Sequence, residues 1–487
     1  MSNNASCSVG YSEWRWVQGF LAGPFSSHCE NPNARNAVLQ RNHCAATGYA
    51  DWRRTLRKML AIIVLTVGVV SGTAIAQDQS TGEEIAALRR ENATLRERVE
   101  KLETALSEIQ GMLVQQPAAT VEEDKPAVRS SYPVVLYGFV KFDAAYDSAR
   151  TDVGNFARWV ESEQGREDDD QFNATARESR LGLKFDGPDL ADVITSGRVE
   201  VDFYEGGAEN KNRLMMRHAY VQLDWPEHDF GLLAGQTSDV ISPLYPQTLN
   251  YPVAWWAGNI GYRRPQLRLT KGFGVGEDSR MLLQAAATRT IGHDGLFDPG
   301  DTGEDAGFPG FQGRAALSFP MLTGRKTTLG VSGHFAQEEY DFDSRDHSTD
   351  LESWSANLDL TLPIYDWLTF KGELWTGQNL DAYLGGIGQG INLVRMKEIE
   401  STGGWMALSF EPHGRWHYNA GISIDDPEDD DLDAGDRSRN SAVWGNVIYD
   451  VNQAVQAGLE LSYWETDYKH LEDGESIRLQ TSLIYRF

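Results

Sequence analysis

The chain has 487 residues and a formal net charge of −27. Its 71 acidic residues outnumber 44 basic ones, which argues against a nucleic-acid partner, because such a partner requires a basic face. The three cysteines, Cys7, Cys29 and Cys44, lie close to the N-terminus. The rest of the sequence therefore carries neither a disulfide framework nor a cysteine-based metal site. The length predicts several structural units or one large repetitive unit.

The one long apolar run covers residues 59–76 and follows a basic stretch at 53–58. It ends in Ala74-Ile75-Ala76, a small-x-small pattern that is typical of signal-peptide cleavage. We therefore predict a signal peptide over 59–76. A retained membrane anchor is the alternative, although Ser, Gly and Thr at 71–73 make the apolar core short for a span of about 20 residues. We interpret residues 1–58 as a doubtful leader, with a start codon assigned too far upstream.

A heptad pattern follows, because apolar residues recur in alternating steps of three and four. Its core positions are Ile85, Leu88, Asn92, Leu95, Val99, Leu102, Leu106, Ile109 and Leu113. We predict a periplasmic α-helical coiled coil over 83–114, in which Asn92 costs stability but fixes the register of a parallel homo-oligomer. The heptads alone do not distinguish a trimer from a dimer, and a single amphipathic helix packed on its own domain is the alternative. The polar, proline-bearing residues 115–132 are predicted to form a linker.

The sequence changes to a period of two over residues 133–487. Near the C-terminus, Leu479 and Leu483 lie on one face of such a run and Gln480 lies on the other, as in a half-buried strand. About sixteen runs of this kind follow one another, among them 134–147 and 174–186. Short turns alternate with long, mostly acidic loops, of which 338–351 is one. These patterns predict an all-β transmembrane barrel of about sixteen antiparallel strands. An even strand number places both chain ends on the short-turn side, which would be the periplasm.

The two faces of the predicted strands differ in chemistry, with charged residues on one and Leu, Val or Phe on the other. Sixteen strands enclose too wide an interior for side chains to fill. We therefore expect the apolar face to contact lipid and the polar face to line a water-filled lumen. Tyr and Trp near strand ends, such as Tyr365 and Tyr449, fit interfacial girdles. A soluble β-sandwich or propeller is the alternative.

Four short segments carry a family resemblance: 179–185 (SRLGLKF), 217–223 (RHAYVQL), 231–236 (GLLAGQ) and 485–487 (YRF). In these segments and in the coiled coil, the chain resembles the general Gram-negative porins, and among them the DcaP-like trimeric porins. The resemblance implies a homotrimer of 16-stranded barrels in the bacterial outer membrane, with the third long loop folded into each lumen. It also implies uptake of small anionic solutes such as dicarboxylates, and insertion by the barrel-insertion machinery through the aromatic C-terminus at Phe487.

The third long loop, residues 237–259, is the predicted constriction. It contains one acid, Asp239, no base, and the bulky residues Tyr245, Tyr251, Trp255 and Trp256. Alternation predicts a basic lumen wall made of Arg180, Lys184, Arg198, Arg264, Arg268 and Arg314, to which the resemblance adds Arg213 and Arg217. Because a narrow pore focuses the field of such charges, we expect an anion-preferring constriction. The alternative is that these bases pair with Glu200, Asp202 and Glu373 and only brace the wall.

The acidic excess lies mostly in the predicted outer loops, with eight acids at 425–436 alone. These acids suit either bridging of lipopolysaccharide through divalent cations or a solvated rim. We expect no enzymatic activity, no cofactor and no bound metal, since the histidines form no HExxH pattern and no close pair beyond His413 and His417. The sequence thus predicts an outer-membrane porin for passive diffusion of small hydrophilic solutes and ions. A barrel anchor or adhesin and a lipase-like barrel enzyme are the alternatives.

Overall fold

The computed structural model describes residues 131–164, 169–188, 192–205, 212–292, 303–304, 306–343, 347–392, 394–412 and 414–487. By its internal contacts the chain divides into units 1–125 and 126–487, and the described residues all belong to the second unit. The predicted leader, signal peptide and coiled coil, with nearly all of the linker, lie outside the described residues. They remain predictions.

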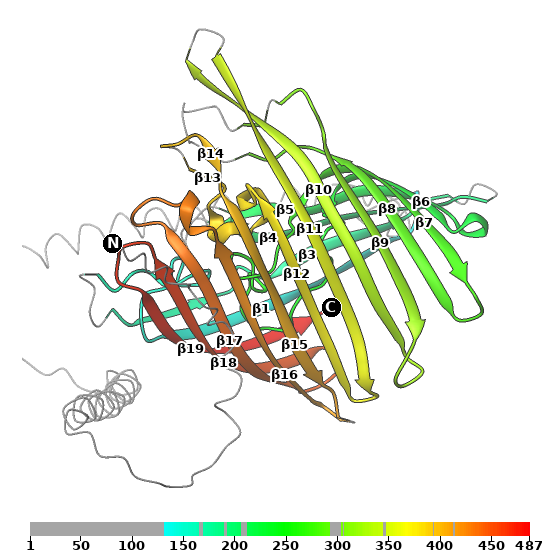
Figure 1. Ribbon diagram of the computed structural model, residues 1–487. Helices are drawn as coiled ribbons and strands as arrows, with labels where there is room; N and C mark the ends of the chain where they lie inside the picture. The colour runs from blue at the N-terminus through cyan, green and yellow to red at the C-terminus, as the bar shows by residue number, and fades with distance from the viewer. Residues whose placement is uncertain are drawn as a thin grey trace, which may run out of the picture. The chain divides into compact units, whose positions relative to one another are not determined.

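The second unit contains a closed antiparallel sheet of seventeen strands (Figure 1). The strands are β1 (Val134–Asp147), β2 (Gln171–Thr175), β3 (Arg180–Asp186), β4 (Ile194–Glu205), β5 (Arg213–Trp225), β6 (Phe230–Ser238), β7 (Arg263–Val275), β8 (Ser279–Thr288), β9 (Gly310–Pro320), β10 (Lys326–Asp343), β11 (His347–Tyr365), β12 (Leu368–Gln378), β15 (Glu400–Phe410), β16 (Trp416–Pro427), β17 (Arg437–Asp450), β18 (Val455–Tyr468) and β19 (Gly474–Arg486). Because β2 and β3 both pair with β1, they fill one position in the wall. The wall therefore has sixteen strand positions, which confirms the predicted barrel.

The barrel closes where the last strand meets the first. β1 and β19 pair from Phe139 opposite Arg486 to Asp147 opposite Arg478. At the end of this seam, the backbone N–H groups of Gly138 and Phe487 each donate to the carbonyl oxygen of the other, at 3.1 Å. The aromatic C-terminal residue is thus part of the closure, which leaves no free sheet edge at the seam.

Short connections follow β3, β5, β7, β9, β11, β15 and β17, and none exceeds the seven residues of 187–193. In an antiparallel barrel these turns share one end with the two ends of the wall, which we call the short-turn end. The connections at the other end, the outer end, include three long loops: 148–170, 239–262 and 379–399. This arrangement agrees with the alternation of short and long connections in the sequence.

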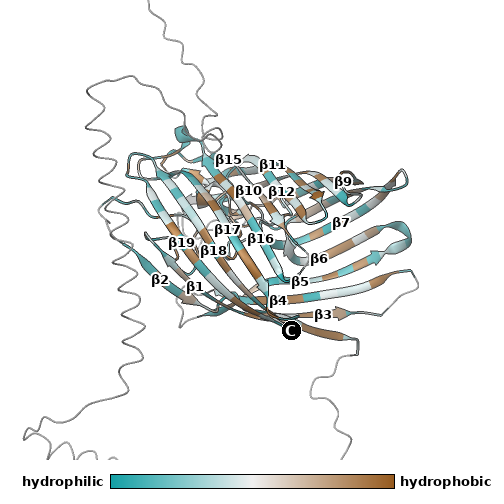
Figure 2. Cartoon of the chain, turned by 90° about the horizontal axis from the view of Figure 1, so that it is seen from below, coloured by the Kyte–Doolittle hydropathy of each residue, from teal (hydrophilic) through white to brown (hydrophobic). Residues whose placement is uncertain are grey.

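Side chains alternate between the two faces of the wall, as the hydropathy colouring in Figure 2 shows along the strands. On β19, Leu479 and Leu483 are 47% and 52% exposed, whereas Gln480 between them is 2% exposed. The exposed face is apolar and the shielded face is polar. This is the reverse of a water-soluble barrel, and it suits a wall with lipid outside and water within.

Aromatic side chains gather on strands β11 to β17 near the short-turn end. Tyr365 stacks on Trp367 with ring centroids 5.0 Å apart, and Trp367 meets Phe410 edge-on at 5.1 Å. Trp416 lies 4.6 Å from Tyr449 on the next strand. The residues are amphipathic or apolar and partly exposed, as side chains at a membrane interface are.

Local features differ from the sequence prediction in three places. The run predicted at 174–186 is interrupted at 176–179, where the Arg177 guanidinium donates to the carbonyl oxygens of Phe203 (3.2 Å) and Tyr204 (2.9 Å). The loop predicted at 338–351 is wrong, because β10 and β11 stay paired as far as Asp343 and His347 and form the long hairpin of Figure 1. A small hairpin within the loop 379–399, β13 (Ile391–Asn392) with β14 (Lys397–Glu398), was not predicted.

Beside the strands, the described residues contain the short 3-10 helices η2 (Pro226–His228), η3 (Asp381–Tyr383), η4 (Gly386–Gly388) and η5 (Asp429–Asp431). In the described part of the chain no helix has the length and apolar character needed to cross a membrane.

Replacing Leu461 with Arg tests the lipid-facing assignment. Leu461 is 56% exposed near the middle of β18. An outward charge at that depth would lower the free energy of unfolding by about 2–4 kcal/mol, measured by denaturant unfolding in phospholipid vesicles. The matched variant Gln284→Arg places the same charge on the inward face of β8 and is expected to cost far less. Equal losses for the two variants would contradict the assignment of the faces.

Candidate pore constriction

The loop 239–262 crosses the interior of the barrel. Its polar contacts reach nine strands of the wall through Arg264, Gln312, Ser332, Glu373, Asn446, Glu460, Gln480, Lys141 and Asp202. Of these strands, β4 and β12 lie on opposite sides of the sixteen-position wall. A loop that contacts both sides must span the lumen, and this places it where the predicted constriction loop was expected. The loop begins at residue 239 rather than 237, because β6 runs through Ser238.

Two carboxylates of the wall hold the loop by its backbone. Glu373 on β12 accepts a hydrogen bond from the N–H of Leu244 at 2.7 Å. Glu460 on β18 accepts hydrogen bonds from the hydroxyl of Thr248 and the N–H of Leu249, both at 2.7 Å. Each of these side chains is 1% exposed, so the two wall residues hold the loop from inside the packed interior. Glu373 therefore tethers the loop. Among the described residues it forms no ion pair with a wall arginine, so this part of the alternative interpretation is wrong.

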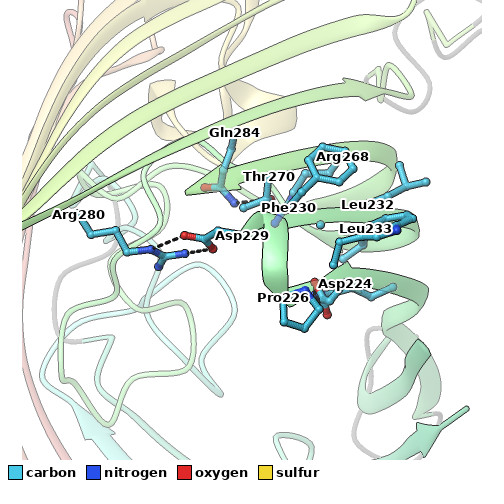
Figure 3. Close-up of a pocket in the computed structure, with 13 residues that line it drawn as sticks. Asp224, Pro226, Asp229, Phe230, Leu232, Leu233, Arg268, Thr270, Arg280 and Gln284 are labelled. Atoms are coloured by element: carbon cyan, nitrogen blue, oxygen red, sulfur yellow. Dashed lines mark hydrogen bonds and ion pairs between the residues drawn. The ribbon is translucent and has the colours of Figure 1, made fainter. Parts of the chain in front are cut away.

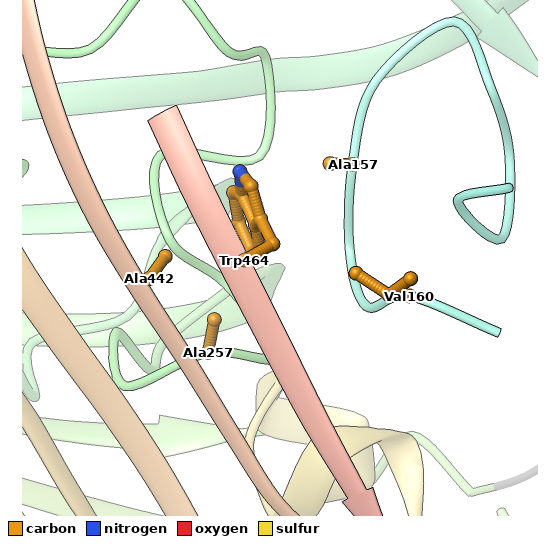
Figure 4. Close-up of a cluster of buried hydrophobic side chains, with 5 residues drawn as sticks. All are labelled: Ala157, Val160, Ala257, Ala442 and Trp464. Carbon is orange, nitrogen blue, oxygen red and sulfur yellow. The ribbon is translucent and has the colours of Figure 1, made fainter. Parts of the chain in front are cut away.

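Apolar packing fixes the loop at the outer end of the barrel. Figure 4 shows Ala157 and Val160 of the loop 148–170 beside Ala257 of the loop 239–262, with Ala442 on β17 and Trp464 on β18. All five residues are at most 3% exposed. Two loops far apart in the sequence thus share one small core with the wall.

A second core brings in the loop 379–399. Ile241 and Ile260 of the constriction loop pack with Trp375, Leu380 and Tyr383. The indole N–H of Trp375 donates to the carbonyl oxygen of Gly258 at 2.7 Å. Burial raises the pKa of Tyr383 to about 12, so its phenol stays neutral at physiological pH. The loop 379–399 thus packs against the constriction loop at the outer end of the barrel.

Basic residues gather around Glu200 on β4, on the side of the wall opposite Glu373. The Arg217 guanidinium donates to Glu200 at 2.9 Å and to Asp202 at 2.6 Å. Arg198 also donates to Glu200, and Arg180 Nε lies 3.4 Å from it. Three guanidinium groups therefore meet two carboxylates, which leaves the cluster with a net charge of +1. A β-bulge between β4 and β5 brings Arg217 inward, where strict alternation was ambiguous.

The bases and acids of this region differ in exposure. The side chains of Arg180 and Arg198 are 22% and 29% exposed, whereas those of Glu200 and Asp202 are at most 1% exposed. Lys184 is exposed beside Arg198 in the strand register. Water in the lumen therefore contacts the bases and not the carboxylates that accompany them.

Arg268 on β7 is a further inward base. Its guanidinium donates to the side-chain oxygen of Gln266 at 2.9 Å and to the carbonyl oxygen of Ser238. Within the described residues, neither Arg268 nor Lys184 forms an ion pair with a carboxylate; the ammonium of Lys184 lies 5.0 Å from the ring centroid of Tyr137. The charges of Arg268 and Lys184 are therefore not cancelled by an adjacent acid.

The other predicted bases have different surroundings. Arg264 is 1% exposed and donates to Asp239 at 2.8 Å. Arg314 donates to Asp359 at 2.6 Å, and its side chain is 8% exposed. These two bases brace the wall, as the alternative interpretation held, but through Asp239 and Asp359. Arg213 is exposed at the outer end of β5.

The predicted aromatic residues occupy several positions in the constriction. Tyr251 donates to Asp202 at 3.2 Å and stacks on Tyr204, with ring centroids 3.6 Å apart. Trp255 is 4% exposed, and Tyr245 is 39% exposed. The ring of Trp256 lies 4.8 Å from the Arg158 guanidinium.

Sequence reasoning gave no role to Arg263. It is 4% exposed, and its guanidinium lies 4.7 Å from the ring centroid of Tyr262 and 5.5 Å from that of Trp255. Alternation places position 263 on the outward face, but β7 begins at this residue. The alternation along β7 therefore could not reveal that Arg263 is buried, because the aromatic rings beside it belong to the loop 239–262.

Two cavities lie between the constriction loop and the short-turn end. One, of about 370 Å³, is lined by residues that include Lys141, Arg180 and Thr248. The other, of about 450 Å³, is shown in Figure 3 with Arg268 on one side and the Arg280–Asp229 ion pair at its edge. Hydrogen bonds from Arg280 lower the pKa of Asp229. Both cavities are lined by polar and apolar side chains together.

Some acidic residues of the stretch 425–436 are buried and form hydrogen bonds or ion pairs within the protein. Asp425 is buried and accepts hydrogen bonds from the Ser401 hydroxyl (2.8 Å) and the N–H of Ile387 (3.2 Å). Asp431, 4% exposed, pairs with Lys397. Across the described ranges, no group of three or more His, Cys, Asp or Glu side chains is placed to hold a metal ion. His413, one of the close pair in the sequence, lies outside the described residues.

Comparison of the chain with protein-family models and with curated proteins finds no match. Among solved structures, the outer membrane channel DcaP of Acinetobacter baumannii matches with a TM-score of 0.60 at 20% identity, covering 74% of this chain and 100% of that one. The anion-selective porin from Comamonas acidovorans matches with a TM-score of 0.46 at 13% identity, covering 73% and 100% of the two chains. Salmonella typhi OmpF in complex with daunomycin matches with a TM-score of 0.48 at 12% identity, covering 73% of this chain and 98% of that one. The described barrel therefore has the fold of the outer-membrane channel DcaP, as the sequence resemblance predicted.

Replacing Gly258 with Ala tests how the loop is held. Gly258 has φ +114°, and an added Cβ would lie 2.3 Å from the carbonyl oxygen of Gly404. We expect the loop to shift, the free energy of unfolding to fall by about 1–3 kcal/mol, and single-channel currents to become larger and noisier. The control Gly274→Ala adds a methyl group with nothing within 4 Å. Unchanged currents in the Gly258 variant would show that the loop does not limit the pore.

Proposed function

We propose that the chain is an outer-membrane porin for passive diffusion of small hydrophilic solutes, with a preference for anions such as dicarboxylates. The closed barrel with an apolar outer face and the DcaP-like fold support the porin role. The observation that carries the preference is the difference in exposure between inward bases and inward acids. Lys184, Arg198 and Arg268 contact lumen water, whereas Glu200 and Asp202 do not.

The proposed preference for anions follows from the bonding of the inward-facing carboxyl groups. Glu373 and Glu460 hold the constriction loop, and both are 1% exposed. A carboxylate that accepts backbone hydrogen bonds and is shielded from the lumen repels a passing anion less than an exposed one does. The exposed bases act across a narrow, partly dehydrated space, where their field is focused. Transport under this proposal needs no energy input and breaks no bond.

Three further parts of the proposal rest on sequence patterns. A homotrimer, aligned by a periplasmic coiled coil over 83–114, would place three pores side by side in the outer membrane. The signal peptide at 59–76 would direct export, and Phe487 would engage the barrel-insertion machinery. Exposed acids of the outer loops would contact lipopolysaccharide and its divalent cations, whereas Asp425 and Asp431 are already used within the fold.

The reversal potential in planar bilayers with a KCl gradient tests the preference. We expect a chloride permeability greater than that of potassium. In the double variant Lys184→Glu with Arg268→Glu, this preference should fall or reverse, because both bases lack a carboxylate partner among the described residues. Arg325→Glu, at a short turn outside the lumen, should leave the reversal potential unchanged.

Cation preference in the unmodified protein would contradict the proposed selectivity. Swelling of liposomes in small sugars and dicarboxylates separates a pore from the adhesin or barrel-enzyme alternatives. The absence of swelling would contradict the porin role itself.

A further inference from the structure

Arg263, the first residue of β7, carries a charge that no carboxylate of the described residues neutralises. The residue is 4% exposed. Its Nε and Nη2 atoms are buried, and in the described part of the chain neither has a hydrogen-bond partner. A buried guanidinium without a partner is costly, so its presence requires an explanation.

Two other shielded arginines of the wall are each neutralised by a carboxylate. Arg314 donates from Nε and Nη2 to the two oxygens of Asp359, at 3.1 and 2.6 Å. Arg478, which is 0% exposed, donates to both oxygens of Asp147 at 2.9 and 2.8 Å. The edge of the guanidinium that Arg314 uses in this way, from Nε to Nη2, is the edge that is unpaired in Arg263.

Aromatic rings of the constriction loop take the place of a carboxylate at Arg263. Its Cζ atom lies 4.7 Å from the ring centroid of Tyr262 and 5.5 Å from that of Trp255. A ring face attracts a cation, and the attraction is strongest where water is excluded. The rings carry no net charge, so they stabilise the guanidinium without cancelling its positive charge.

The charge of Arg263 adds to the basic cluster around Glu200. Arg263 lies close enough for its charge to act on His218 of β5 and on Tyr251 of the constriction loop, as that of Arg217 also does. The three guanidinium groups and two carboxylates of the cluster have a net charge of +1. With Arg263 there are four guanidinium groups and two carboxylates, so the net charge of the region becomes +2.

We propose that Arg263 is a specificity-determining residue of the constriction, where it selects anions as a buried charge that no acid cancels. Its field passes through protein of low dielectric constant into a narrow lumen, which focuses it. Salt screens a buried charge less than an exposed one. Arg263 therefore attracts anions at ionic strengths that weaken the contribution of an exposed base such as Lys184.

Arg263→Met tests the inference, which rests on the proposed porin role, through opposite effects on stability and selectivity. Removing Arg263 leaves no acid unpaired, so the denaturant midpoint of unfolding in phospholipid vesicles should stay the same or rise. The ratio of chloride to potassium permeability, obtained from the reversal potential in a KCl gradient, should fall by about twofold or more. Arg263→Lys keeps the charge and should keep most of this ratio.

Two comparisons isolate the effect of a buried charge. The control Arg325→Met removes the same charge from an exposed short turn between β9 and β10 and should leave the permeability ratio unchanged. Raising the KCl concentration from 0.1 M to 1 M shortens the screening distance from about 10 Å to about 3 Å. The change in the ratio caused by Arg263→Met should persist at 1 M, whereas the change caused by Lys184→Met should shrink.

Heat-modifiable mobility in gels checks that each variant is folded. An unchanged permeability ratio in Arg263→Met, an equal loss in Arg263→Lys, or the same salt dependence as Lys184→Met would overturn the inference. Cation preference in the unmodified protein would contradict only the proposed selectivity, because Arg263→Met must still shift the reversal potential toward the potassium equilibrium potential. The absence of channels would contradict the porin role and this inference together.

Discussion

The whole structure depends on a wall that must satisfy two environments at once. Each strand turns one set of side chains outward and the next set inward, so a single sheet is apolar on one face and polar on the other. Closure between β1 and β19 removes the free edges that such a sheet would otherwise expose. Sixteen positions are too many for side chains to fill the interior, and loops from the outer end therefore occupy part of it.

The loops decide which charges remain in contact with water. Glu373 and Glu460 accept hydrogen bonds from the backbone of the constriction loop, and Asp239 at its start binds Arg264. Each of these acids is at most 5% exposed. The strong negative charge of the chain is therefore a poor guide to the charge that a solute meets inside the pore.

Much of the wall could be predicted from the sequence because strand alternation is a local property. The run predicted at 134–147 matches β1 residue for residue, and the resemblance carried by segments such as 179–185 implied sixteen strands, which is the observed number of strand positions in the wall. The prediction of Arg180, Lys184 and Arg198 on one inward face required only a period of two.

The details of the constriction could not be predicted in this way. Burial of Arg264, the pairing of Arg314 with Asp359 and the position of Arg263 among aromatic rings all depend on segments distant in the sequence. The break at 176–179 has the same origin, because Arg177 bonds to backbone oxygens of β4. Periodicity shows which face a side chain occupies, but not which loop covers it.

Charged thiol reagents applied to a cysteine placed in the lumen test the central claim most directly. The sequence after Cys44 is free of cysteine, so Gln284→Cys would provide a single reactive group in the 450 Å³ cavity. An anionic methanethiosulfonate should modify it faster than a cationic one and reduce the current, while Leu461→Cys should resist both reagents. Modification of Leu461→Cys alone, or faster reaction of Gln284→Cys with the cationic reagent, would contradict a water-filled interior lined by exposed bases.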